Sequence, residues 1–229
     1  MEKYQVDFSK TAHFRGIRIL FEFLEEGLDH AQENGIKEIC VWADSDSSKH
    51  VVNFDFLKDR DFIETFHWLV PMSKKSSIDG LKYLFGLKNL RWNGASDFNL
   101  NLTIFPALEE LNIGYGPKIS GWENLTSLKK LLISSVKTSD LSLLQQAINL
   151  EYLRIIGGTF TTIAGLENCK KLETLFLQKC TTLITLQPTI RNLDNLVQLN
   201  LEGCKKVNVE QELADLDIMY ISIIWRNNI

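Results

Sequence analysis

The stretch GLENCKKLETLFLQKC (Gly165–Cys180) changes its apolar spacing partway along. Its apolar positions lie first three residues apart and then two apart, at Leu166, Cys169, Leu172, Leu175 and Leu177. A helix keeps spacings of three and four, and a strand keeps a spacing of two. The first half is typical of a 3₁₀-like turn, in which side chains at i and i+3 eclipse. The stretch therefore predicts a bend that leads into a short strand.

The same change of spacing recurs along the chain as the pattern Leu-x-x-Leu-x-Leu. Strong copies are LKNLRW from Leu87, LEELNI from Leu108, LKKLLI from Leu128, LEYLRI from Leu150, LETLFL from Leu172 and LVQLNL from Leu196. Looser copies begin at Ile63 and Ile218, and IKEICV at Ile36 is a candidate for the first. From Ile63 onward the starts are 24, 21, 20, 22, 22, 24 and 22 residues apart. A regular period in the twenties indicates stacked supersecondary units.

Over residues 63–225 these copies resemble the leucine-rich-repeat family, and the period near 22 is similar to its short, internalin-like class. The family's ninth position, usually Asn or Cys, is filled by Cys180 and Cys204. It departs from that pattern at Ala95, Gly116, Val136 and Gly158. The resemblance implies an α/β solenoid, a leucine-rich-repeat horseshoe with parallel concave strands and a 3₁₀-like or irregular convex side.

The two ends of such a stack need covering, so caps are expected. Residues 1–62 are predicted to form an N-terminal α-helical cap, and residues 63–229 the repeat array. One apolar stripe predicts a helix over about 15–34, ended by Gly35 and followed by a first strand at about 36–41. The stripe consists of Ile17, Leu20, Phe21, Leu24, Leu28 and Ala31. At the other end, either Trp225 and Ile229 fold over the last strand or its edge meets another chain.

Composition excludes several classes of protein. With 45% hydrophobic and 24% charged residues, the 229-residue chain is typical of a globular protein. Its net charge of −4 argues against general nucleic-acid binding. The start lacks a secretory pattern, and no apolar run approaches the roughly 20 residues of a membrane span. The sequence therefore predicts a cytoplasmic protein with no membrane association, whose four cysteines are free thiols.

No motif for catalysis or cofactor binding occurs, so no enzyme, catalytic residue or cofactor is predicted. The four histidines are scattered in the first third of the chain: His13, His30, His50 and His67. Asp44, Asp46 and Asp55 are spaced like the start of a calcium loop, but Lys49 stands where the turn needs glycine. No metal site is predicted.

The solvent-facing residues of the predicted strands are the candidate site, because alternate residues share one face. Aromatic, apolar and cationic types gather there, and such types are enriched in interface hot spots. The candidate protein-binding residues are Arg91, Asn112, Tyr115, Lys130, Leu132, Tyr152, Arg154 and Phe176. The alternative is that these side chains only satisfy β-propensity and pack on one another. A second row alternates in charge and predicts cross-strand pairing: Lys37, Glu64, Lys88, Glu109, Lys129, Glu151 and Glu173.

These observations, with the resemblance, predict a non-enzymatic module that binds another protein through its concave face. One candidate is a cytosolic immunity or inhibitor protein that neutralises a toxin. Acidic residues of the cap could steer it toward a basic toxin, but a solvated loop is the simpler explanation of them. They are Asp44, Asp46, Asp55, Asp59, Asp61 and Glu64. The alternatives are a regulatory or scaffold subunit of a host enzyme and an internalin-like surface adhesin. The oligomeric state is left open.

Overall fold

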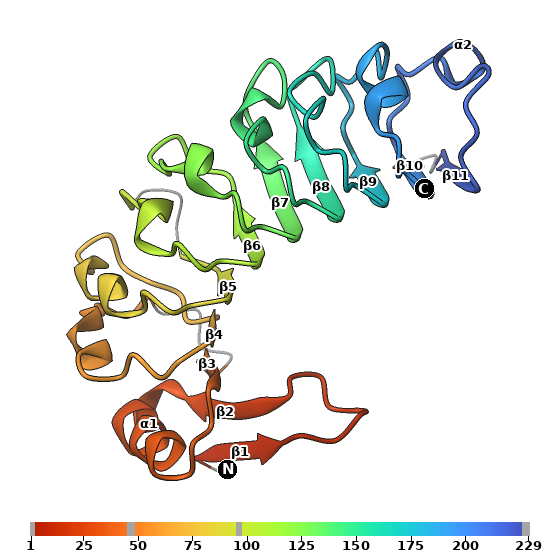
Figure 1. The fold of residues 1–229 in the computed structure, drawn as a ribbon. Helices are drawn as coiled ribbons and strands as arrows, with labels where there is room; N and C mark the ends of the chain where they lie inside the picture. The colour runs from red at the N-terminus through yellow and green to blue at the C-terminus, as the bar shows by residue number, and fades with distance from the viewer. Residues whose placement is uncertain (1–2, 45–48, 95–97, 226–229) are drawn as a thin grey trace. The chain divides into compact units, whose positions relative to one another are not determined.

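A computed structural model describes residues 3–44, 49–94 and 98–225 (Figure 1). The chain divides into two compact units. Unit 1 comprises residues 1–108 and 118–120, and unit 2 comprises residues 109–117 and 121–229.

The described residues of unit 1 form five strands, one α-helix and four 3₁₀ turns. They are β1 (Tyr4–Asp7), β2 (Gly16–Leu20), η1 (Phe21–Phe23), α1 (Leu24–Glu33), β3 (Glu38–Trp42), η2 (Phe54–Leu57), β4 (Thr65–Trp68), η3 (Asp79–Tyr83), β5 (Asn89–Trp92) and η4 (Leu102–Ile104). β1 pairs with β2 in an antiparallel hairpin, and β2 to β5 are parallel neighbours in chain order.

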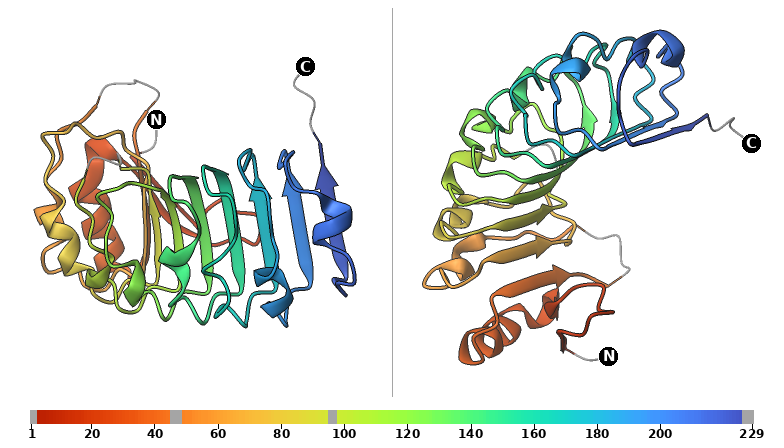
Figure 2. Two further views of the ribbon diagram at one scale, coloured as in Figure 1. Left: turned by 90° about the horizontal axis from the view of Figure 1, so that it is seen from above. Right: turned by 45° about the vertical axis from the view of Figure 1, so that its right-hand side comes forward.

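Unit 2 contains six parallel strands, which also pair in chain order. Its elements are β6 (Glu110–Gly114), η5 (Trp122–Asn124), β7 (Lys130–Val136), η6 (Ser142–Leu144), β8 (Tyr152–Gly158), β9 (Thr174–Gln178), η7 (Thr189–Asn192), β10 (Gln198–Glu202), α2 (Val209–Glu212) and β11 (Tyr220–Ile224). Figure 2 shows the strands of unit 2 side by side, with the turns on the opposite side of the unit. The predicted solenoid arrangement is confirmed.

The leucines of the repeat build the core of each strand. In β9, Leu175 and Leu177 are fully buried, and they lie in register with Leu153 and Ile155 of β8, which are buried too. Parallel strands in register stack these side chains about 4.8 Å apart. Removing one of them would leave a cavity in a packed ladder, and Leu175→Ala should cost about 2–5 kcal/mol.

The bend predicted for Gly165–Cys180 is confirmed. The amide of Cys169 donates to the carbonyl of Leu166 (2.9 Å), and that of Leu172 donates to Cys169 (3.0 Å). These i to i+3 bonds are of the 3₁₀ type and give way to strand β9. Gly165 has a φ of +105°, and a Cβ there would lie 2.3 Å from the carbonyl carbon of Leu141. The turn therefore requires glycine at this position.

The predicted helix over residues 15–34 is wrong in its first half. Gly16–Leu20 is strand β2, and the α-helix begins only at Leu24. Ile17 and Ile19 alternate with Arg18, and both isoleucines are fully buried, so burial against β3 selects the two-residue period. The helical stripe is confirmed for Leu28 and Ala31.

Two further predictions concern the same region. Gly35 ends the helix with a φ of +65°, as expected. The strand predicted at 36–41 exists as β3, but it is the third strand of the chain, not the first. The boundary between cap and array at residue 62 stays a prediction.

The last repeat is held by a buried carboxylate. Glu212 in α2 is 9% exposed, and its Oε2 accepts hydrogen bonds from Thr185 Oγ1 (2.9 Å) and from the amides of Leu186 (2.8 Å) and Gln187 (2.9 Å). A buried carboxylate needs such donors, and here they tie the turn after β10 to the turn after β9.

Beyond α2, β11 carries exposed apolar side chains, and Trp225 is 45% exposed. The sequence left open whether Trp225 and Ile229 fold over this strand or its edge meets another chain, and Ile229 lies outside the described residues. Among the described residues, no helix combines the length and apolar composition that crossing a membrane requires.

Candidate binding surface on the strands of unit 2

Three neighbouring strands bring five of the predicted residues together. Lys130 of β7 pairs in register with Tyr152 of β8, and Leu132 pairs with Arg154. Arg154 in turn lies opposite Phe176 of β9. Because alternate residues of a strand point to the same side, these five side chains share one face. We call the outward side of the parallel strands in each unit its strand face.

The other predicted residues lie at the margin of this group or in the other unit. Asn112 of β6 is opposite Leu132, so it extends the same row. Tyr115 follows β6, and its amide donates to the carbonyl of Ser134 (2.8 Å). Arg91 belongs to β5 of unit 1.

Arg154 is held in place by its neighbours. Its guanidinium carbon lies 4.7 Å from the centre of the Phe176 ring, and its Nη2 donates to Gln178 Oε1 (2.8 Å). The side-chain amide of Gln178 donates in turn, through Nε2, to Glu202 Oε2 (2.9 Å). Guanidinium stacked on an aromatic ring gains roughly 0.5–1 kcal/mol at exposed sites. The cation is therefore presented in one orientation.

Two members of this network were not predicted. Gln178 and Glu202 occupy the next outward position of their strands, opposite one another in register. Glu202 is only 6% exposed, and Arg154 Nε is a buried donor that has no partner among the described residues. The two-residue alternation that predicts Arg154 and Phe176 to face outward also predicts this for Gln178 and Glu202. The sequence therefore contained the signal for these two residues, one outward position further along each strand.

Lys130 is neutralised within the sheet. Its Nζ lies 2.8 Å from Glu110 Oε1 on the neighbouring strand, and this hydrogen bond raises the pKa of Lys130. Lys129 pairs in the same way with Glu109 (2.8 Å). In unit 1, Glu64 bridges both Lys37 and Lys88, at 2.7 Å each. The predicted cross-strand pairing is confirmed for Lys129 with Glu109 and for Glu64 with its two lysines.

The acidic residues of the predicted cap are partly engaged as well. Asp55 accepts a hydrogen bond from Asn53 Nδ2 (2.7 Å), and the two lysines hold Glu64. Asp44 lies within the described range, whereas Asp46 lies outside it.

The described residues offer little reactive chemistry. No group of three or more His, Cys, Asp or Glu among them could hold a metal ion. Burial raises the pKa of the Cys40 thiol to about 11 and that of Cys169 to about 12, so neither is a ready nucleophile at neutral pH. What the surface can offer is stacking, apolar contact and an oriented cation.

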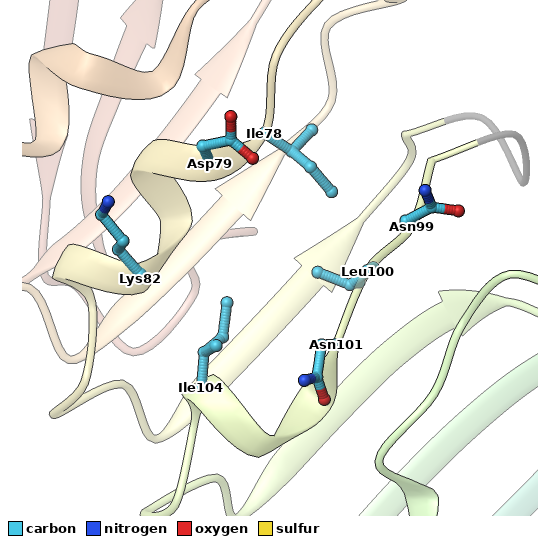
Figure 3. Close-up of a pocket in the computed structure, with 7 residues that line it drawn as sticks. All are labelled: Ile78, Asp79, Lys82, Asn99, Leu100, Asn101 and Ile104. Carbon is cyan, nitrogen blue, oxygen red and sulfur yellow. The ribbon is translucent and has the colours of Figure 1, made fainter.

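A cavity of about 330 Å³ lies on the turn side of unit 1 and contains no predicted site residue. Figure 3 shows three apolar side chains, Ile78, Leu100 and Ile104, directed into it from the segments around η3 and η4. The polar lining consists of Asp79, Lys82, Asn99 and Asn101. Asp79 and Asn101 are engaged locally, with Ser77 Oγ (3.0 Å) and with the amide of Thr103 (3.1 Å). Those polar groups support the turns.

Known proteins were compared with the chain in sequence and in structure. No protein-family model matches the chain. Over 122 residues it is 33% identical to disease resistance protein RPP2A of Arabidopsis thaliana, a match that covers 50% of this chain and 9% of that protein. The chain thus spans less than a tenth of that relative.

Two solved structures have a similar fold. An internalin (inlF) from Listeria monocytogenes superposes with a TM-score of 0.59 at 19% identity, over 83% of this chain and 54% of that one. Internalin C2 (inlC2) from the same organism gives 0.56 at 17% identity, over 87% and 83%. The chain therefore spans about half of the first internalin. Together with the repeat and its register, these likenesses show that the chain has the short-repeat, internalin-like leucine-rich-repeat fold.

Proposed function

We propose that this chain is a non-enzymatic module that binds a partner protein through the strand face of unit 2. The leucine-rich-repeat fold suggests protein–protein interaction. The observation that carries the proposal is the placement of Arg154 on Phe176 of β9, beside Leu132 of β7 and Tyr152 of its own strand β8. Arginine and aromatic residues dominate interface energies.

Preorganisation favours binding by this group. An arginine that is free in solution loses side-chain entropy when a partner immobilises it, roughly 0.5–1.5 kcal/mol per long side chain. Arg154 has already lost much of that freedom to Phe176 and Gln178. The strand backbone beneath is fixed by pairing on both sides, so the partner meets a rigid surface.

The alternative reading of these residues is that they serve the sheet alone. Contact between Arg154 and Phe176 would then contribute to stability, and nothing outside the chain would touch it. The two readings separate when a variant keeps its fold and loses the outward side chains.

Finer versions of the proposal differ in the partner. An immunity or inhibitor protein would act in the cytoplasm on a toxin, and a regulatory subunit would hold an enzyme of its own cell. An internalin-like adhesin would act at a surface, and the fold it shares with two internalins supports this version most directly. The acidic residues of the cap favour a basic toxin less than the sequence indicated, because Glu64 is already bridged by two lysines.

Affinity capture from the lysate of the source cell, followed by mass spectrometry, tests the proposal. Wild type is compared with the triple variant Tyr152→Ala, Arg154→Ala, Phe176→Ala. The matched control carries Tyr83→Ala, Phe85→Ala, Arg191→Ala, which removes the same residue types outside the strands. We expect a protein that wild type and the control retain and the triple variant loses. A partner retained equally by all three would overturn the assignment to this face.

A further inference from the structure

The strand face of unit 1 carries two arginines at the ends of one row of residues. Four residues lie directly opposite one another on neighbouring strands: Arg18 of β2, Cys40 of β3, His67 of β4 and Arg91 of β5. Three spacings of about 4.8 Å separate the ends of the row, so the two arginines start about 14 Å apart at the backbone. Arg91 is exposed, and Arg18 is partly exposed.

Two side chains of the row, Arg18 and His67, lie against aromatic rings. The guanidinium of Arg18 lies 5.6 Å from the centre of the Trp42 ring, on the neighbouring strand. The His67 ring lies 4.9 Å from that of Phe14, in the segment that leads into β2. His67 Nε2 is also 3.2 Å from Asn89 Oδ1. The row is therefore built on fixed contacts, as an interface residue needs.

The charges of both arginines act on the centre of the row. Burial raises the pKa of the Cys40 thiol, while the charges of Arg18 and Arg91 and a hydrogen bond from Arg18 act in the opposite direction. Both side chains therefore add positive charge to the field at Cys40.

Among the described residues of unit 1, no ion pair compensates the charge of these two arginines. Other cations of unit 1 are compensated by ion pairs. Lys37 and Lys88 share Glu64, and Arg60 pairs with Glu25 and Asp29. Within residues 3–44, 49–94 and 98–225, by contrast, neither Arg18 nor Arg91 forms an ion pair. Glu38, the acid on the same face of β3, does not come within ion-pair distance of either.

Two like charges on a partly desolvated face repel one another, and an anion between them relieves that cost. Arginine presents a planar fork that pairs carboxylates through two hydrogen bonds. The two arginines start about 14 Å apart at the backbone, and carboxylates spaced along a peptide can pair with each of them in turn.

We infer that the strand face of unit 1 is a docking surface for an acidic segment of a protein partner, whose carboxylates pair with Arg18 and Arg91. The inference rests on the proposed function, because it assumes a protein partner, and it adds the charge that the partner must carry. The inference also argues against a partner whose whole binding surface is basic.

Fluorescence anisotropy with a labelled eight-residue peptide tests the inference. The peptide alternates Glu with Gly or Ser, and its control has Gln at each Glu. At low salt, wild type should bind the Glu peptide at least about tenfold more tightly than the Gln peptide, since charge-assisted pairs contribute roughly 1.5–3 kcal/mol each. Arg18→Gln with Arg91→Gln should remove the difference. Lys58→Gln with Lys75→Gln, an equal change of charge elsewhere in unit 1, should preserve it.

Three results would overturn the inference: equal binding of the two peptides, full binding by the Arg18→Gln, Arg91→Gln variant, or displacement of the Glu peptide by inorganic phosphate at concentrations where acetate has no effect. Circular dichroism checks the fold, and Arg91→Gln alone, at an exposed position, keeps the test valid if the double variant unfolds. The triple variant Tyr152→Ala, Arg154→Ala, Phe176→Ala should bind the Glu peptide as wild type does. If the strand face of unit 2 proved not to bind a partner, the peptide affinity measured for unit 1 would therefore be unchanged.

Discussion

Arg154 lies over the ring of Phe176 on the neighbouring strand, with its guanidinium carbon 4.7 Å from the ring centre. The contact joins two residues that the repeat places at the same outward position of consecutive turns of the solenoid. It orients a cation on a rigid sheet, which is what a binding surface requires, and it also makes the two residues energetically dependent on one another.

That dependence can be measured in the free protein. A double-mutant cycle with Arg154→Met and Phe176→Leu should give a coupling free energy of unfolding of about 0.5–1 kcal/mol, the usual range for an exposed cation–π pair. Denaturant unfolding of the four proteins supplies it. Additive effects within error would show that the stacking seen here contributes nothing in solution.

Removing the carboxylate that anchors α2 should destabilise the last repeat. Glu212→Ala leaves the buried amide of Leu186 without its acceptor, at a cost of roughly 1–3 kcal/mol, and removes one of the hydrogen bonds of the partly buried Thr185 hydroxyl and Gln187 amide. Thermal unfolding should show a lower midpoint than for Glu210→Ala, which changes an exposed residue of the same helix. Identical midpoints would refute the anchoring role.

The cysteines should be unreactive in the folded protein. All four are buried, and the pKa of the Cys180 thiol is raised by its hydrogen bond with Cys204 and by burial. With the pKa of Cys40 near 11 and that of Cys169 near 12, little thiolate exists at pH 8. Labelling with a thiol-specific disulfide reagent should be slow in buffer and complete in guanidinium chloride. Rapid native labelling of any of the four would contradict the burial described.

The lysine bridges to Glu64 should appear in the pH dependence of stability. Hydrogen bonds from Lys37 and Lys88 hold the pKa of Glu64 below its ordinary value of 4.5. A depressed carboxylate pKa stabilises the fold above pH 4.5, and this contribution disappears as the pH falls through the native pKa. Wild type should therefore exceed Glu64→Gln in stability at pH 7 and lose that advantage in acid. An advantage that grew in acid would reverse the assigned sign.

Much of the fold could be predicted because the repeat is local. The switch from three-residue to two-residue spacing around Leu175 encodes both the 3₁₀ turn and the strand, and each copy restates it. The error at Gly16–Leu20 has a physical cause. Ile17, Leu20 and Leu24 suit a helical stripe as well as Ile17 and Ile19 suit a strand, and only pairing with β3 decides between them.

The sequence could predict which side chains of the candidate surface point outward, but not which of them contact one another. Alternation places Arg154 and Phe176 outward, yet whether they stack depends on rotamers that a pattern does not encode. The link through Gln178 to Glu202 was missed because it lies one outward position beyond the rows that were compared. The uncompensated arginines of unit 1 emerged only once the pairing of strands β2 to β5 was known.

Photo-crosslinking tests the central claim most directly. A benzophenone amino acid replaces Phe176 in one protein and Ile148, an exposed apolar residue outside the strands, in another. After irradiation with the captured partner, position 176 should yield a covalent adduct and position 148 should not. An adduct from position 148 alone would place the partner away from the strands of unit 2 and contradict the proposed function.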